Sequence, residues 1–341
     1  MRYANLLLFG LLLPFTLQAR ILRVNHSAAL GQCVDPSVCF TGDDALQVAV
    51  AAALPNDTLH IEPSDLNYGD VLDLDKPLVF IGAGYFLGGA TGNAGLQANA
   101  QTSKVNLFQL IAGSEGTRII GLHFELQFGG LELTNTSNIH ILRNWFDNVN
   151  IDFPSNSTIS DILIGENYLD GRIFEGQFAQ IINNLTIRNN YITGQIQLDE
   201  SPDEIVNLVI TNNTLNSSNA HTVKNAEVAY NVFYVGTISG NNLTVHDNIS
   251  ATALPAGTNN AVVSMGTVYN LTVGSEDTKW NILSASTYNE TGASGRGMYS
   301  GISPYRPSGI ANIPTIYALQ STLNTQPGGS VQVTLSTRTN P

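Results

Sequence analysis

The chain has 341 residues, of which 43% are hydrophobic and only 12% are charged, and its formal net charge at pH 7 is −13. This length and apolar content allow one large domain or two modest ones with a sizeable core. Fourteen Lys and Arg residues against 27 Asp and Glu argue against sequence-independent binding to nucleic acid, which needs clustered cations. The low charge and the 36 asparagines argue against a coiled coil or a helical bundle.

Residues 1–19 have the pattern of a secretory signal peptide: Arg2 supplies a positive start, Leu6–Leu13 is a short apolar run, and Ala19 is a small residue at the exit. The run is shorter than the roughly 20 apolar residues that cross a bilayer. We therefore expect no membrane span and a secreted, cell-surface or periplasmic protein. The alternative is that the segment is a buried N-terminal helix.

The chain contains only two cysteines, Cys33 and Cys39, in a turn-rich segment. In an exported protein two such cysteines are expected to close a small disulfide loop. A two-cysteine metal site is the alternative, but no histidine lies beside the pair. We therefore expect a disulfide and no metal site here.

Asparagine recurs at a fixed interval in the middle of the chain. The first four of the series are 23 residues apart, and the last two follow at steps of 18 and 17. The series is Asn144, Asn167, Asn190, Asn213, Asn231 and Asn248. Apolar residues lie five and three positions before each asparagine, as Ile139 and Ile141 do before Asn144. Alternation with a period of two predicts a short strand with one buried face before every asparagine.

The fixed position of the asparagine has a physical explanation. Asparagine tolerates the left-handed backbone conformation of a tight corner, and its amide both donates and accepts hydrogen bonds. Strands about 4.8 Å apart bring stacked amides within bonding reach, so we expect a structural asparagine ladder. The earlier segment TRIIGLHF has Ile119 and Phe124 in the same register, but Leu122 occupies the asparagine position. A leucine-rich repeat is the alternative, but its Leu-x-x-Leu-x-Leu frame and helical return are not seen.

The repeat and two opening segments together carry a resemblance to a known family. The segments are GDDALQVAVAAALPNDTLHI (42–61) and KPLVFIGAGYF (76–86). The chain resembles the right-handed parallel β-helix proteins of the pectin-lyase-like superfamily over roughly residues 40–300. The resemblance implies a capping helix followed by two strands in the opening segments. The apolar face of Ala45–Ala53 agrees with such a helix, and Asp43 or Asp44 is placed to cap it.

The expected fold is all-β: a right-handed parallel β-helix, or solenoid, with a short N-terminal capping helix and a β-rich C-terminal cap. Beyond Tyr299 the repeat is lost, and 330–339 alternates like one exposed strand; a flexible tail is the alternative for this end. The expected divisions are a signal peptide (1–19), an N-terminal cap with the disulfide loop and the capping helix (20–65), the parallel β-helix (66–300), and the C-terminal cap or tail (301–341).

The resemblance also implies where chemistry would lie, because enzymes of this superfamily act on acidic polysaccharides in a groove on the outer face of the sheet. The motif sets of polygalacturonases and pectin methylesterases are not recognisable, and the only adjacent aspartate pair, Asp43-Asp44, belongs to the expected capping helix. A lyase needs a basic residue and a cation beside the uronate carboxylate. The four lysines of the chain lie in no such motif; they are Lys76, Lys104, Lys224 and Lys279.

The strands after three of the corners, VNIDF, GRIFE and GQIQL, place Ile151, Ile173 and Ile196 inward. Their neighbours then point to solvent on one face. These candidate glycan-contact residues are Asn150, Asp152, Arg172, Phe174, Gln195 and Gln197. Amides, an acid, a guanidinium and an aromatic ring in one row suit a sugar chain, whereas the alternative is an ordinary solvated face.

Four acids in one turn offer oxygen ligands to calcium, namely Asp199, Glu200, Asp203 and Glu204. A plain charged loop is the alternative, and we expect no resident metal; calcium enters only if the protein is a lyase. The histidines His123, His140 and His221 share no ligand-like spacing and are expected to be isolated outward or turn residues. Trp145 and Trp280 are expected to pack.

A regular structural repeat without a recognisable set of catalytic residues predicts a secreted, non-catalytic module. This module is structural or contacts glycans, with polysaccharide as its partner. The alternative is a polysaccharide lyase or glycoside hydrolase that acts on acidic polysaccharide through the face of Asp152 and Arg172. A third hypothesis is an adhesin or a stacked envelope protein.

Overall fold

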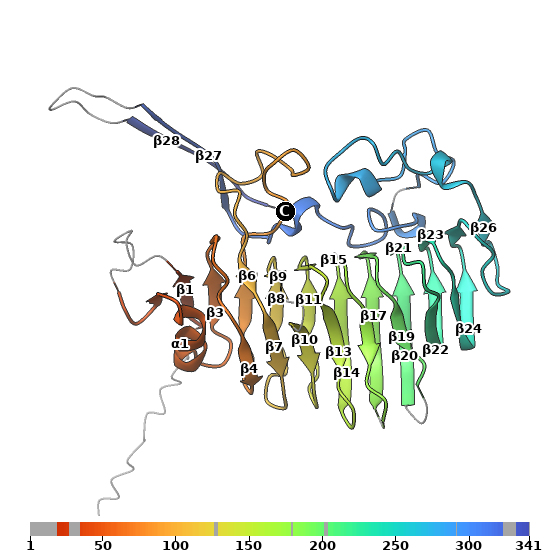
Figure 1. The fold of residues 1–341 in the computed structure, drawn as a ribbon, viewed down its shortest axis with the longest axis horizontal. Coiled ribbons are helices and arrows are strands. Elements are labelled where there is room, and N and C mark those ends of the chain that lie inside the picture. Colours follow the sequence, from red (N-terminus) through yellow and green to blue (C-terminus); the bar gives the residue numbers. More distant parts are fainter. Residues whose placement is uncertain are drawn as a thin grey trace, which may run out of the picture.

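The computed structural model describes residues 19–26, 35–125, 129–178, 180–200, 204–290, 292–322 and 332–340. Within these ranges the chain forms a 17-stranded and a 9-stranded parallel sheet, a two-stranded antiparallel hairpin and one α-helix. Figure 1 shows the parallel strands side by side along the long axis of the molecule. The predicted all-β parallel class is confirmed, and the arrangement is compatible with a β-helix.

The larger sheet contains the strands of two sides of each repeat. Its strands are β1 (Ile21–Asn25), β2 (Cys39–Thr41), β3 (Thr58–Ile61), β4 (Val71–Leu74), β5 (Val79–Ile81), β7 (Leu107–Leu110), β8 (Arg118–Ile120), β10 (Gly130–Leu133), β11 (His140–Leu142), β13 (Asn150–Phe153), β14 (Thr158–Gly165), β16 (Ile173–Glu175), β17 (Ile181–Arg188), β19 (Ile196–Leu198), β20 (Glu204–Thr211), β22 (His221–Ala229) and β24 (Ile238–His246).

The smaller sheet contains the short strands that follow the corners. These are β6 (Lys104–Val105), β9 (His123–Phe124), β12 (Trp145–Phe146), β15 (Tyr168–Leu169), β18 (Tyr191–Ile192), β21 (Thr214–Asn216), β23 (Val232–Val235), β25 (Ile249–Ser250) and β26 (Ala261–Val262). They pair in chain order, each strand with the one from the next repeat. One repeat therefore adds one rung to each side of the stack.

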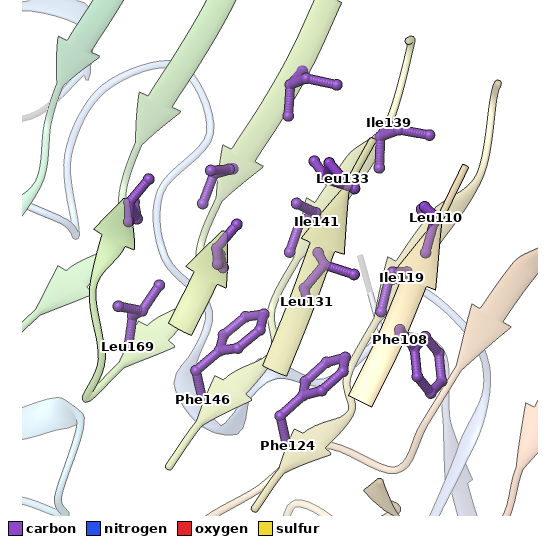
Figure 2. Packing of buried hydrophobic residues seen from close by; sticks show 14 of the residues in the cluster. Phe108, Leu110, Ile119, Phe124, Leu131, Leu133, Ile139, Ile141, Phe146 and Leu169 are labelled. Carbon is purple, nitrogen blue, oxygen red and sulfur yellow. The ribbon is translucent and has the colours of Figure 1, made fainter. Parts of the chain in front are cut away.

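The aliphatic residues of the repeat form columns inside the stack. Parallel pairing places Ile141 beside Ile164, Ile164 beside Ile187, and Ile187 beside Ile210, and all four are fully buried. Phenylalanines extend the core, and Figure 2 shows Phe124 and Phe146 with their rings side by side; the ring centroids are 4.7 Å apart. Complete burial of each such side chain contributes about 1.5–3 kcal/mol.

The asparagines form one buried, hydrogen-bonded column. Nδ2 of Asn144 donates to Oδ1 of Asn167 at 3.2 Å, and Nδ2 of Asn167 donates to Oδ1 of Asn190 at 2.9 Å. The same side chains also donate to backbone carbonyls of the preceding rung, as Asn167 Nδ2 does to Ile141 O at 2.9 Å. The amides thereby satisfy backbone groups that the corner leaves without a strand partner.

The left-handed conformation lies one residue earlier than we expected. Arg143, Glu166 and Asn189, each directly before a ladder asparagine, have φ between 56° and 59°. The asparagine itself must point inward to reach the neighbouring amide, so the preceding residue takes the sharp turn. The ladder also extends beyond the predicted series, because Asn248 Nδ2 donates to Oδ1 of Asn260 at 3.0 Å.

The N-terminal helix α1 (Ala45–Ala52) packs Ala45, Leu46 and Ala49 against the first rungs. Asp44 occupies the N-cap position, but its side chain makes no capping hydrogen bond, contrary to expectation. In the described ranges no helix is long and apolar enough to cross a bilayer. The expected signal peptide (1–18 of it) and Cys33 lie outside the described residues, so the disulfide with Cys39 stays a prediction.

The parallel sheets begin earlier in the chain, and also end earlier, than the sequence indicated. Strands β1 to β3 already pair in the larger sheet, inside the segment expected to be a separate cap. At the far end the sheets stop at Val262 instead of continuing to residue 300. Residues 263–314, here called the return segment, pass along the outside of the smaller sheet and contain the 3₁₀ helices η2 (Met265–Thr267), η3 (Thr278–Trp280), η4 (Gly292–Ser294) and η5 (Pro307–Gly309).

The outward side of the smaller sheet explains this course. It carries a column of large rings, Trp145, Tyr168 and Tyr191, which would be exposed without a cover. The return segment covers Tyr191 with Trp280, and their ring centroids are 4.6 Å apart. Phe86 covers Trp145, with ring centroids 4.7 Å apart. This second apolar cluster is the reason that the C-terminal region lies along the stack rather than across its end.

The chain then ends in the hairpin of β27 (Thr315–Thr322) and β28 (Gln332–Arg338), which projects from the stack in Figure 1. Ala98 N donates to Ile316 O at 2.8 Å, so the hairpin lies beside the first rungs. The expectation that the C-terminal segment closes the far end was therefore wrong. The strand predicted within 330–339 is confirmed over Gln332–Arg338, but its partner β27 was not foreseen.

Candidate functional site

Four of the six candidate residues lie on the neighbouring strands β13, β16 and β19, and Arg172 and Gln195 directly precede β16 and β19. Parallel pairing places Ile151 beside Ile173 and Ile173 beside Ile196, with all three side chains buried. The residues between and before them alternate outward because side chains of a strand point to opposite faces in turn. The register thus brings Asp152, Phe174 and Gln197 into one column. Asn150, Arg172 and Gln195 adjoin it: the backbone N–H of Arg172 donates to Oδ1 of Asn150 at 3.0 Å, and the N–H of Ile173 donates to Gln195 O at 3.1 Å.

The first column extends toward the N-terminus by two residues that the sequence analysis missed. Glu132 pairs in register with Asp152, and Gln109 pairs with Glu132; Gln109 Nε2 donates to Glu132 Oε2 at 2.7 Å. Both precede the first ladder asparagine, so no repeat marked their strands. The alternation in Gly130–Leu133 was the available signal. We call the eight side chains the outer row: Gln109, Glu132, Asn150, Asp152, Arg172, Phe174, Gln195 and Gln197.

Arg172 is the most exposed member of the original six residues, and it is held by two neighbours. Its guanidinium carbon lies 5.0 Å from the centre of the Phe174 ring, and its backbone N–H donates to Oδ1 of Asn150 at 3.0 Å. A guanidinium over an aromatic face is stabilised by the ring quadrupole. Arg172 and Phe174 therefore present a flat cationic surface that is ordered before any ligand arrives.

The two glutamines are also oriented by the protein. Gln195 Nε2 donates to Ala220 O at 2.7 Å, and Gln197 Nε2 donates to Oε1 of Glu200 at 3.1 Å. These bonds fix which way each amide faces. Because a side-chain amide oxygen accepts two hydrogen bonds, each glutamine retains acceptor capacity for a hydroxyl group.

The pKa of the Asp152 carboxyl group is strongly perturbed. Its pKa is raised to about 6, first by burial and then by the neighbouring charge of Glu132, while Arg172 acts in the opposite direction. Its Oδ1 is buried and has no hydrogen-bond partner among the described residues. A carboxyl group in this state is partly protonated near neutral pH and is able to donate as well as accept a proton.

No protein-family model, curated protein or solved structure matches this chain. Any functional conclusion therefore depends on the chemistry of the outer row. Amides, carboxylates, a guanidinium and an aromatic ring together offer hydrogen bonds in both directions and one flat face. These are the contacts that the hydroxyl groups and ring faces of a sugar require.

The described part of the acidic turn does not assemble a comparable set of side chains. Glu200 accepts the hydrogen bond from Gln197, Asp199 is exposed, and Asp203 lies outside the described residues. No group of three or more His, Cys, Asp or Glu side chains is arranged to hold a metal ion in the part of the chain that the structure describes.

The remaining singled-out side chains are dispersed. His221 is fully buried and faces the core, and His123 is also buried, so the expectation of outward or turn histidines was wrong for both. His123 stacks on Trp145 with ring centroids 3.8 Å apart, and Trp280 is buried. Both tryptophans thus pack in the outer apolar cluster, as expected.

Proposed function

We propose that this protein is an exported right-handed parallel β-helix of the pectin-lyase-like type whose outer row binds polysaccharide without cleaving it. The observation that carries the proposal is the register of β13, β16 and β19, which together with the residues directly before β16 and β19 gathers six sugar-compatible side chains from three repeats on one outer face. Export is supported by the signal-like pattern of residues 1–19.

The shape of the row favours an extended ligand. Its members come from five neighbouring strands, β7, β10, β13, β16 and β19, spaced by about 4.8 Å, so the row is about 19 Å long. A polymer with repeated hydroxyl groups matches such a periodic set of donors and acceptors. Arg172 provides the one cationic group of the row, which suits a chain that carries carboxylates.

The contacts within the row favour binding over catalysis. Gln109 is engaged with Glu132, Gln195 with a backbone carbonyl, and Gln197 with Glu200, so much of the row is occupied in holding its own geometry. Arg172 is the one basic side chain of the outer row, and its guanidinium lies over the Phe174 ring, so the row contains no lysine or histidine to act as the base of an elimination reaction.

A glycoside hydrolase is the second candidate function, and one observation favours it. Glu132 and Asp152 are cross-strand neighbours, and the pKa of Asp152 is raised to about 6. Hydrolysis of a glycosidic bond uses two carboxyl groups, one of which keeps its proton near neutral pH. Asp152 would be the acid and Glu132 the nucleophile or base.

An array of acidic and neutral polysaccharides separates these functions. The binding module retains one or more acidic polysaccharides and releases neither new reducing ends nor ultraviolet-absorbing unsaturated uronates. New reducing ends that vanish in Asp152→Asn and Glu132→Gln would establish the hydrolase instead. Absence of binding to every polysaccharide of the array would contradict both functions.

A further inference from the structure

A cavity of about 480 Å³ lies away from the outer row, where the return segment meets the base of the hairpin. Its volume is within the range of small-molecule sites, about 300–1,000 Å³. Apolar side chains form much of its wall, among them Leu96, Pro304 and Ile310. Two arginines, Arg306 and Arg338, also line it.

Among the described residues, Arg306 has no acidic partner within hydrogen-bond distance. Its Nε is 4.0 Å from Oε2 of Glu166, which is beyond hydrogen-bond distance. That same oxygen already accepts a 2.7 Å hydrogen bond from Nε of Arg143. Two guanidinium groups therefore share one carboxylate. Burial and the neighbouring Arg143 lower the pKa of Arg306, which is the direction expected for a cation without sufficient compensation.

Arg338 is also incompletely satisfied. One of its terminal nitrogens, Nη2, donates to Leu96 O at 2.9 Å, and its guanidinium lies 5.6 Å from the centre of the Tyr317 ring. Its Nε is buried and has no hydrogen-bond partner among the described residues. A buried guanidinium N–H without an acceptor is costly, and an anion in the cavity would supply that acceptor.

The two charged side chains that line the cavity, Arg306 and Arg338, are both cationic. Two carboxylates lie behind its wall: Glu166 is engaged by Arg143, and buried Asp277 accepts a hydrogen bond from the hydroxyl group of Tyr305. The whole chain has only 14 Lys and Arg residues and a net charge of −13, so two arginines in one cavity run against the composition. Guanidinium groups bind carboxylates through paired N–H donors.

We propose that this cavity binds a small organic acid, with its carboxylate between Arg306 and Arg338 and its body against Leu96, Pro304 and Ile310. The apolar wall favours an organic ligand over inorganic phosphate. The site shares no residue with the outer row, so a failure of polysaccharide binding would not contradict this proposal.

Isothermal titration with benzoate tests the proposal, with benzyl alcohol as the uncharged analogue and inorganic phosphate as the other anion. Benzoate is expected to bind saturably with one site per chain, and at least tenfold more weakly to Arg306→Gln and to Arg338→Gln. Arg118→Gln, which removes an exposed arginine on β8, and Phe174→Ala in the outer row should bind benzoate as the unchanged protein does.

Circular dichroism at the titration temperature verifies that each variant retains its sheets. Arg338→Lys keeps the charge and the hairpin but removes Nε, and it should still weaken benzoate binding at least fivefold. The proposal is overturned if benzoate does not bind saturably, if benzyl alcohol binds as tightly, if phosphate binds in its place, or if the folded arginine variants keep full affinity.

Discussion

Nε of Arg143 donates a 2.7 Å hydrogen bond to Oε2 of Glu166, one rung away in the stack, and both side chains are buried. Both residues occupy the left-handed corner position directly before a ladder asparagine. Each also holds the return segment, since Arg143 Nη1 donates to Ile310 O at 3.2 Å and Glu166 Oε1 accepts from Ser303 Oγ at 3.3 Å. The corners therefore bend the chain and fasten its C-terminal part.

Breaking this pair from one side should destabilise the protein strongly. Glu166→Ala leaves Arg143 buried without its carboxylate, and we expect a loss of about 3–5 kcal/mol in the free energy of unfolding. Glu290→Ala, which breaks the more exposed pair with Arg296, should cost less than about 1 kcal/mol. Urea denaturation measures both values; equal losses in the two variants would contradict the structural role of Glu166.

The ladder makes a separate prediction about stability. Asn190→Ala removes the acceptor of two donors on Asn167 and the donor to Ile164 O, so we expect a loss of about 3–5 kcal/mol. The matched control is Asn184→Gly, which removes an exposed amide but keeps the left-handed conformation of its corner. The control should lose less than about 1 kcal/mol, and an Asn190 variant as stable as this control would show that the ladder is dispensable.

The burial of His221 predicts that the free energy of unfolding decreases at acidic pH. It is fully buried, and burial lowers its pKa from 6.5 to about 4. Between these pH values the unfolded chain binds a proton at this residue and the folded chain does not, so stability falls as the pH decreases from 6.5 to 4. The loss is on the order of 3 kcal/mol. Denaturation of His221→Leu at pH 7 and pH 4.5 should show a smaller difference than the unchanged protein; an identical difference would place the acid sensitivity elsewhere.

The raised pKa of Asp152 predicts the opposite dependence of stability on pH. Its pKa is raised in the folded protein to about 6, so ionisation is disfavoured there and stability falls as the pH rises from 3.8 through 6. Asp152→Asn removes this penalty and should be more stable than the unchanged protein by about 1–2 kcal/mol at pH 7.5, with little difference at pH 4. Asp161→Asn, at an exposed corner, is the control and should change stability little at either pH. If Asp152→Asn is no more stable at pH 7.5 than at pH 4, the raised pKa is wrong.

The sequence predicted those parts of the fold that repeat. Each 23-residue interval contains an alternating apolar pair and an asparagine, and burial of the former and bonding of the latter leave only one register for the strands. Leu122 shows that the corner joins the ladder even without an asparagine of its own. It stands where the first asparagine is missing, and its backbone N–H donates to Oδ1 of Asn144 at 3.0 Å.

The parts that do not repeat were not predictable in the same way. The return segment is fixed by contacts between residues that lie far apart in the chain, such as Asn189 Nδ2 with Met298 O at 3.0 Å. Trp145, Tyr168 and Tyr191 were the available signal, because three large rings on an outward column require a cover. The candidate row was found only where the repeat continued, and Glu132 and Gln109 were therefore missed.

Binding of polygalacturonate tests the central claim most directly, with affinity gel electrophoresis as the measurement. The unchanged protein should be retarded by the embedded polymer, and the double variant Arg172→Ala, Phe174→Ala should lose at least tenfold in affinity while Arg118→Ala keeps it. A protein that neither this polymer nor any other acidic polysaccharide retards, or a folded double variant that is retarded as strongly as the unchanged protein, would contradict the outer row as a polysaccharide-binding surface.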